Sequence, residues 1–159
     1  MASSATIIGL ESHAVYNTAF APLERGAIPI ATGGSPVALT GGQDFEAAQL
    51  NSLSLEKNTI VFRPTLAETE SAAFKVIVGD AKYTRGGLLK GTIFDSVDGG
   101  LLEIKGGASE LTSSYQLRLQ TYYSLKNGMP FTIRTARPVN PEFRAWLQRW
   151  GVNVEGTSP

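Results

Sequence analysis

The sequence predicts a mainly β protein: an antiparallel β-sandwich or small barrel that carries one short C-terminal α-helix and an extended N-terminal arm. Three observations favour this fold class. Residues 115–123 alternate between two faces, short β-branched runs lie between glycine-containing turns, and residues 12–42 show no sustained period. The 159 residues, 42% of them hydrophobic and 18% charged, suit one folded domain. We expect an arm with a possible short helix over residues 1–56 and a β domain over residues 57–159.

The expected arm is rich in apolar residues and in proline. Pro22, Pro29 and Pro36 recur every seven residues, and proline disfavours both helix interiors and central strands. A long segment without regular structure is usually functional or disordered, and a disordered segment normally holds fewer apolar side chains. We therefore expect the arm to lie on a surface, either of its own domain or of another molecule. Its candidate anchors are Tyr16, Phe20, Leu23, Ile28, Ile30, Val37 and Leu39.

The second half of the chain holds several short candidate strands. Residues 59–63, 74–78, 88–96 and 101–105 are rich in β-branched, aromatic and leucine side chains. Asp98-Gly99 lies between the last two of these runs, and glycine accepts a positive φ at no steric cost. This dipeptide therefore predicts a hairpin.

The clearest candidate strand is residues 115–123. Its residues alternate strictly, which predicts one buried face and one wet face. Asn127-Gly128 then predicts a turn, and residues 131–135 return as the second strand of the hairpin. On this second strand the inward side chains are expected to be Phe131, Ile133 and Thr135.

Two helices are expected. A possible short helix lies at the start of residues 43–57. The second helix, residues 141–150, has stronger signals: Asn140 can cap it, Pro141 suits its first position, and Gly151 supplies the stop. A helix of about three turns is too short to be stable alone, so its apolar stripe must dock on the β core or on a neighbouring subunit. That stripe consists of Phe143, Trp146, Leu147 and Trp150.

The composition excludes several kinds of site. Cysteine is absent and His13 is the only histidine, which excludes thiolate metal sites, disulfides and two-histidine sites. The formal net charge is zero, which argues against a dedicated binder of duplex nucleic acid, and nucleic acid is not expected as a partner of the favoured function. Residues 1–56 hold one base and five acids, and residues 57–159 hold 13 bases and 9 acids; such opposite charges can steer one segment against another. We expect no cofactor, no metal, no signal peptide and no membrane span.

Catalysis is not expected from the acidic residues. Glu68 and Glu70 lie in a polar stretch, and Asp95 and Asp98 flank the expected hairpin turn, where aspartate is common. A distant pair such as Asp95 with Glu110 would still be compatible with a hydrolase whose acids meet only in the fold. Residues 83–91 hold two glycines near two basic residues but no phosphate-loop pattern, and a hairpin turn accounts for them better.

An alternative function is a ligand-binding β module for single-stranded nucleic acid or glycan. Arginines beside aromatic rings on a small barrel are typical of proteins that hold single strands. The wet face of the expected 115–137 hairpin would carry such a set. Its members are Arg118, Tyr122, Arg134 and Arg137.

The favoured function is a non-enzymatic assembly protein that self-associates through its arm. In size, lack of cysteine, expected β content and extended arm, the chain resembles accessory virion proteins of tailed phages, such as capsid decoration or cement proteins. The resemblance implies a homo-oligomer, often a trimer, clamped on a capsid shell within a virion assembled in the host cytoplasm. An arm that reaches a neighbouring subunit adds contacts and raises the effective concentration of its binding segment.

Overall fold

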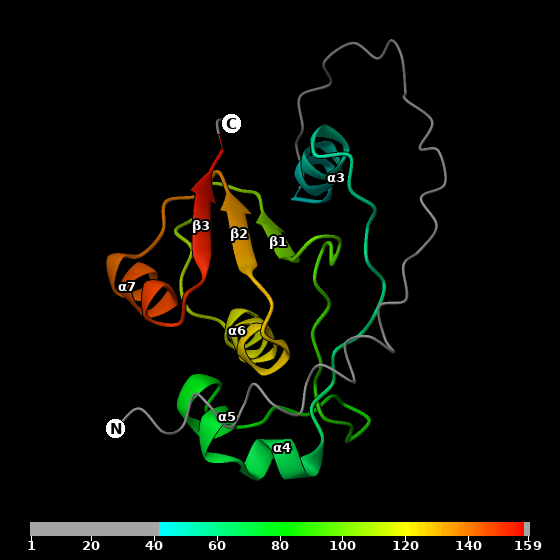
Figure 1. Ribbon diagram of the computed structural model, residues 1–159, viewed down its shortest axis with the longest axis vertical. Helices are drawn as coiled ribbons and strands as arrows, with labels where there is room; N and C mark the ends of the chain where they lie inside the picture. The colour runs from blue at the N-terminus through cyan, green and yellow to red at the C-terminus, as the bar shows by residue number, and fades with distance from the viewer. Residues whose placement is uncertain (1–41, 158–159) are drawn as a thin grey trace.

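The computed structural model describes residues 42–157, so the expected anchors from Tyr16 to Leu39 lie outside the described residues. Within this range the chain forms an open three-stranded parallel sheet in the order β1-β2-β3 (Figure 1). The strands are β1 (Leu101–Lys105), β2 (Phe131–Thr135) and β3 (Asn153–Gly156). The helices are α3 (Gly42–Ser52), α4 (Leu66–Glu70), α5 (Ala72–Ile77), α6 (Tyr115–Asn127) and α7 (Pro141–Arg149).

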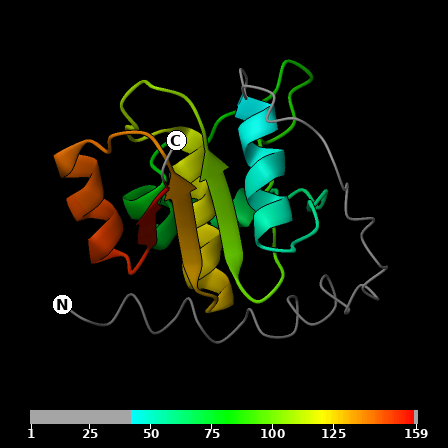
Figure 2. The ribbon, with the colours of Figure 1, turned by 90° about the horizontal axis from the view of Figure 1, so that it is seen from above.

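The elements form layers around α6. This helix connects β1 to β2, lies against one face of the sheet and separates the sheet from α4 and α5 (Figures 1 and 2). The main apolar core fills the space between these layers and includes Phe74, Phe94 and Phe131, each at most 1% exposed. On the opposite face of the sheet, Leu102 and Ile104 of β1 form a small second core with Leu50 of α3. The edge strand β1 is therefore covered on both faces.

The expected fold class is wrong, because the described chain is an α/β structure with a parallel sheet and not a mainly β sandwich or barrel. The largest error concerns residues 115–123, which belong to helix α6. Nine of the 13 residues of α6 are buried, so the helix lacks the polar stripe that would reveal a period of 3.6. Ser114 caps its start, and Gly128, with φ of 61°, ends it in the left-handed conformation. Asn127-Gly128 is thus a helix end and not a hairpin turn.

The other strand predictions had mixed outcomes. Residues 74–78 overlap α5, which Ser71 caps, and residues 59–63 and 88–96 form only isolated bridges, including the antiparallel bridge Phe62–Thr92. Residues 131–135 and 101–105 are confirmed as strands, but β2 pairs in parallel with both β1 and β3.

Several local predictions are confirmed. On β2, Phe131, Ile133 and Thr135 are buried, as the alternation predicted. The turn at Asp98-Gly99 closes an antiparallel bridge between Ser96 and Leu102. Short-range signals therefore located these strands and turns correctly, even where the order of the elements was wrong.

Both expected helices exist. α3 covers the start of residues 43–57, and α7 begins at Pro141 with Asn140 as its cap. The stripe of α7 packs on the core of its own chain: Phe143 and Leu147 are buried in it, and Trp146 and Trp150 pack against it. The start and the end of α7 were predicted from residues 140, 141 and 151. These residues act on the adjacent backbone, so the helix ends can be predicted without knowing what the helix packs against.

Candidate functional site

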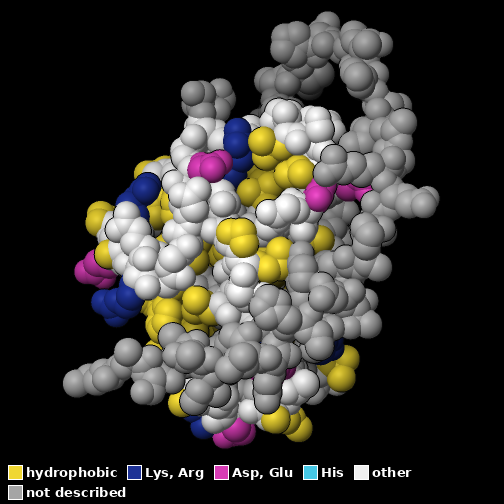
Figure 3. Space-filling view, in the orientation of Figure 1, with side chains coloured by type: hydrophobic (Ala, Val, Ile, Leu, Met, Phe, Trp, Pro, Cys, Tyr) yellow, Lys and Arg dark blue, Asp and Glu magenta, His cyan; other side chains and the backbone are white. Residues whose placement is uncertain are grey.

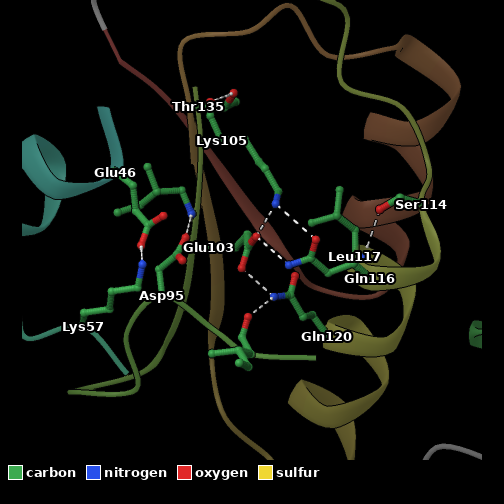
Figure 4. A network of polar contacts seen from close by, with 12 residues as sticks. Glu46, Lys57, Asp95, Glu103, Lys105, Ser114, Gln116, Leu117, Gln120 and Thr135 are labelled. Atoms are coloured by element: carbon green, nitrogen blue, oxygen red, sulfur yellow. Dashed lines mark hydrogen bonds and ion pairs between the residues drawn. The ribbon is translucent and has the colours of Figure 1, made fainter. Parts of the chain in front are cut away.

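Strand β1 carries a glutamate and a lysine on the face that α6 covers. Glu103 and Lys105 are two residues apart, so their side chains point to the same side of the strand. Only 2% of Glu103 is exposed, whereas the side chain of Lys105 keeps 24% of its surface in solvent. The two side chains form an ion pair (Figure 4). β1 thus places a buried carboxylate beside an ammonium group that still reaches water.

Helix α6 holds this ion pair with two amide side chains. Gln116 and Gln120 are one turn apart and therefore lie on the same side of the helix. Gln116 Nε2 donates to Glu103 Oε1 at 3.0 Å, and Gln116 Oε1 accepts from Lys105 Nζ at 3.3 Å. Gln120 Nε2 donates to Glu103 Oε2 at 2.5 Å and to the carbonyl oxygen of Ile93 at 3.1 Å. Both oxygens of Glu103 are thereby fixed in position.

Asp95 lies on the segment that runs beside β1. Its backbone N–H donates to the carbonyl oxygen of Leu102 at 2.9 Å, and its Oδ2 accepts from the N–H of Ile104 at 2.6 Å. Burial, followed by the negative charge of Glu103, raises the pKa of Asp95 to about 7, although the Ile104 N–H opposes the rise. The charge of Glu103 therefore disfavours the ionised form of Asp95.

Helix α3 contributes a third carboxylate, Glu46. Its Oε1 lies 2.7 Å from Nζ of the exposed Lys57, and its charge adds to the rise in pKa of both Asp95 and Glu103. Burial is the main cause that raises the pKa of Glu103, and the ammonium of Lys105 opposes it. We call this group the acidic cluster; its members are Glu46, Lys57, Asp95, Glu103, Lys105, Gln116 and Gln120 (Figure 4).

The amide oxygen of Gln120 in the acidic cluster has no hydrogen-bond or ion-pair partner among the described residues. Gln120 Oε1 is buried, and nothing within residues 42–157 donates to it. An unsatisfied buried acceptor costs about 1–3 kcal/mol, and two carboxylates of raised pKa add a further electrostatic cost. Strongly perturbed acids of this kind concentrate at functional sites. A ligand that brings positive charge and hydrogen-bond donors would relieve both costs.

A hydrated divalent cation fits this description. Mg²⁺ prefers oxygen ligands, keeps several of its waters, and is usually bound by one or two carboxylates together with phosphate oxygens of a substrate. Asp95 and Glu103 supply the two carboxylates. No three His, Cys, Asp or Glu side chains of the described residues could hold a metal among themselves. The coordination would therefore be completed by water and substrate.

The two cavities described for residues 42–157 lie away from the acidic cluster. Two shallow cavities, of about 380 Å³ and 420 Å³, both touch Trp146, and no member of the acidic cluster lines either of them. On the face seen in Figure 3, basic and acidic side chains are scattered and do not gather in one patch. The exposed part of the acidic cluster is thus open to a large substrate.

The expected ligand face does not form. Arg118 lies on α6 and donates from Nε to the carbonyl oxygen of Val78 at 2.9 Å, and Tyr122 is only 4% exposed. Arg134 donates to Gln49 of α3 at 2.8 Å, and Arg137 donates to the carbonyl oxygen of Ser109. Because residues 115–127 are a helix, no hairpin aligns these four side chains, and each contacts a different part of the chain.

The sequence analysis missed most of the acidic cluster. It paired Asp95 with Asp98 or Glu110, whereas Glu110 accepts from Asn140 at 3.4 Å and the acids that affect Asp95 are Glu103 and Glu46. Residues 101–105 were predicted only as a short candidate strand, and no role was expected for Glu103 or Lys105. A parallel sheet is usually covered on both faces. A glutamate and a lysine two residues apart on such a strand would therefore both be covered, and this spacing would have indicated a buried ion pair.

Comparisons with known proteins found no match for this chain: no protein-family model, no curated protein and no solved structure is similar to it. Among the described residues, no helix has the length and apolar character needed to cross a bilayer.

Proposed function

We propose that this chain is a divalent-metal-dependent hydrolase of phosphodiesters and that its substrate is nucleic acid. The observation that carries the proposal is the acidic pair Asp95 and Glu103 with the ammonium of Lys105 on its solvent side. A buried acid beside a half-buried one, both with raised pKa values, is costly to keep in a fold unless a cation offsets their charge. A bound divalent cation would offset the charges of Asp95 and Glu103 and would also supply a catalytic group.

Each side chain has a distinct role in the proposed reaction. Asp95 and Glu103 bind the cation, which would polarise a phosphoryl oxygen and lower the pKa of a bound water. Lys105 faces solvent and stabilises the negative charge that develops on the phosphoryl oxygens. Gln116 contacts both Glu103 and Lys105, so it is a positioning residue.

The reaction is a simple hydrolysis. The oxygen of a water molecule forms a bond to phosphorus, and the bond from phosphorus to one ester oxygen breaks. The water loses a proton to solvent, and the departing alkoxide gains one. No oxidant, reductant or second co-reactant is needed.

Nucleic acid suits the open site better than a small phosphodiester does. Neither of the two cavities described above includes a member of the acidic cluster, so we expect substrate affinity to come from contacts spread along a polymer. The zero net charge argued against a duplex binder, but six of the nine charged residues in residues 57–90 are basic. Local charge near the site, and not the total, decides whether phosphates approach it.

The proposal is tested with the full chain and end-labelled DNA and RNA. We expect cleavage in Mg²⁺ or Mn²⁺, none in EDTA, and a loss on the order of 100-fold or more for Asp95→Asn and Glu103→Gln. Glu110→Gln is the matched control, because it removes an exposed carboxylate outside the acidic cluster. Wild-type protein that leaves every nucleic acid intact in both metals, or variants that cut as fast as wild type, would overturn the proposal.

The assembly function stays a prediction, because its arm lies outside the described residues. It is tested by deleting residues 1–41 and measuring the oligomeric state by light scattering. A smaller oligomer with an intact fold would support self-association through the arm, and an unchanged mass would contradict it.

A further inference from the structure

A basic hairpin projects from the chain just before the segment that carries Asp95. Lys90 N donates to the carbonyl oxygen of Lys82 at 2.7 Å, and Tyr83 pairs with Leu89 in an antiparallel bridge. Gly87, with φ of 78°, supplies the left-handed residue of the turn. The sequence analysis predicted this turn, and the structure confirms it. We call residues 82–90 the basic hairpin.

Within residues 42–157 the charges of the basic hairpin have no acidic partner in an ion pair. Residues 81–94 contain two lysines and one arginine but no acid. Lys82, Arg85 and Lys90 are exposed, and none of them forms an ion pair within the described residues. Three exposed cations on one short hairpin are a local attraction for phosphate groups.

The basic hairpin is attached to the helix that builds the acidic cluster. Tyr115, the first residue of α6, donates its hydroxyl to the carbonyl oxygen of Lys90 at 3.0 Å. Lys82 Nζ lies over the same ring, 5.6 Å from its centroid. The next residue of the helix is Gln116, which contacts both Glu103 and Lys105. Tyr115, which contacts the base of the hairpin, is thus the neighbour in sequence of a member of the acidic cluster.

An aromatic ring and an apolar side chain accompany these charges. Tyr83 is 56% exposed and Leu88 is 59% exposed. An exposed aromatic ring beside cationic side chains can bind unpaired nucleotides, because a base stacks on the ring while the phosphates contact the positive charges. In a duplex the faces of the bases are already stacked and cannot reach such a ring. The hairpin therefore favours an unpaired strand.

We propose that the basic hairpin holds an unpaired nucleic-acid strand and guides it to the acidic cluster, with phosphates on Arg85 and Lys90 and a base on Tyr83. This inference rests on the proposed function for the reaction that follows binding. Binding itself does not depend on the metal, since none of these residues belongs to the acidic cluster. The two proposals can therefore fail separately.

Binding is measured by fluorescence anisotropy in EDTA, with single-stranded DNA and RNA of about 16 nucleotides and the matching duplex. The test variant is Arg85→Gln with Lys90→Gln, and the matched control is Arg144→Gln with Arg149→Gln, which removes two exposed charges from α7. We expect the test variant to reduce the salt dependence of single-strand binding by about 1.4 in the log–log slope. Tyr83→Ala should weaken that binding about tenfold, and Tyr83→Phe should restore it.

The outcomes separate the two proposals. Unchanged single-strand binding in the hairpin variants, or a control pair that loses as much, overturns the inference and leaves the proposed function standing if wild type still cuts. Stronger binding to duplex with no effect of Tyr83→Ala also overturns it. Hairpin-dependent binding without any metal-dependent cleavage supports the inference and overturns the proposed function.

Discussion

Glu103 and Lys105 point to the same side of β1, form an ion pair, and are both contacted by the amide of Gln116. The pair is asymmetric: the carboxylate is almost fully buried, and the ammonium reaches solvent. A pair that only stabilised the fold would gain little, because the desolvation of a buried charge offsets most of the attraction to its partner. The arrangement therefore favours function over stability.

Replacing Glu103 by glutamine should not destabilise the metal-free protein. Glutamine has nearly the same shape and can still accept from Gln120, while the cost of burying a charge disappears. In EDTA we expect the free energy of unfolding to stay within about 1 kcal/mol of wild type or to rise. Chemical denaturation followed by circular dichroism measures it. A loss of several kcal/mol would mean that the carboxylate of Glu103 holds the fold together.

The stability of the metal-free protein should fall as the pH rises from about 4 to about 7. Asp95 has a pKa of about 7 in the fold against an ordinary value of 3.8, and the pKa of Glu103 is also raised. The folded state thus binds more protons than the unfolded state in this window, so deprotonation disfavours folding. The charges that face Asp95 are those of Glu46, Glu103, Lys57 and Lys105.

The same linkage predicts how Mg²⁺ acts. A cation competes with protons for the carboxylates, so Mg²⁺ should raise the melting temperature clearly at about pH 8 and hardly at all at about pH 5. Thermal melts at both pH values, with and without EDTA, measure the difference. An equal effect of Mg²⁺ on Asp95→Asn would show that the cation acts elsewhere.

Lys105 should affect the rate but not the binding of metal. Lys105→Met removes the ammonium that faces the substrate while Asp95 and Glu103 stay in place, so we expect cleavage to slow about 100-fold with Mn²⁺ affinity little changed. Glu103→Gln should lower both quantities. Cleavage rates measured over a range of Mn²⁺ concentrations separate the two effects, and a Lys105→Met variant restored by more Mn²⁺ would contradict the assigned role.

Gly128 should be required at the end of α6. Its φ of 61° is a conformation that side chains with a Cβ rarely adopt, so Gly128→Ala should cost about 1 kcal/mol. Gly86→Ala is the control, since Gly86 lacks a positive φ and a Cβ there meets nothing closer than 3.9 Å. Urea denaturation compares the two variants. Equal stabilities would contradict a helix that ends at Gly128.

Local signals in the sequence predicted part of the fold. The cap and stop of α7, the strand 131–135 and the turn at Asp98-Gly99 depend on a few adjacent residues, and all three were placed correctly. The helix α6 was missed because it is buried on most sides. Its apolar positions then carry no helical period, and Asn127-Gly128 suits a hairpin turn as well as a helix end.

The candidate site could not be found from spacing alone. Asp95 was noted as an acid at a turn, but its partner Glu103 follows that turn, on a strand for which no functional side chain was predicted. Gln116 and Gln120 had no visible role, because they face β1 only if residues 115–127 form a helix. The site depends on that helix, so the error in the fold concealed the chemistry.

The central claim is that Asp95 and Glu103 bind a divalent cation, and the binding of Mn²⁺ by electron paramagnetic resonance tests it most directly. We predict that wild-type protein and Glu110→Gln remove free Mn²⁺ from solution with one site per chain, and that Asp95→Asn with Glu103→Gln leaves the free signal unchanged. Wild-type protein that binds no Mn²⁺, or a double variant that binds it as tightly as wild type, would contradict the claim.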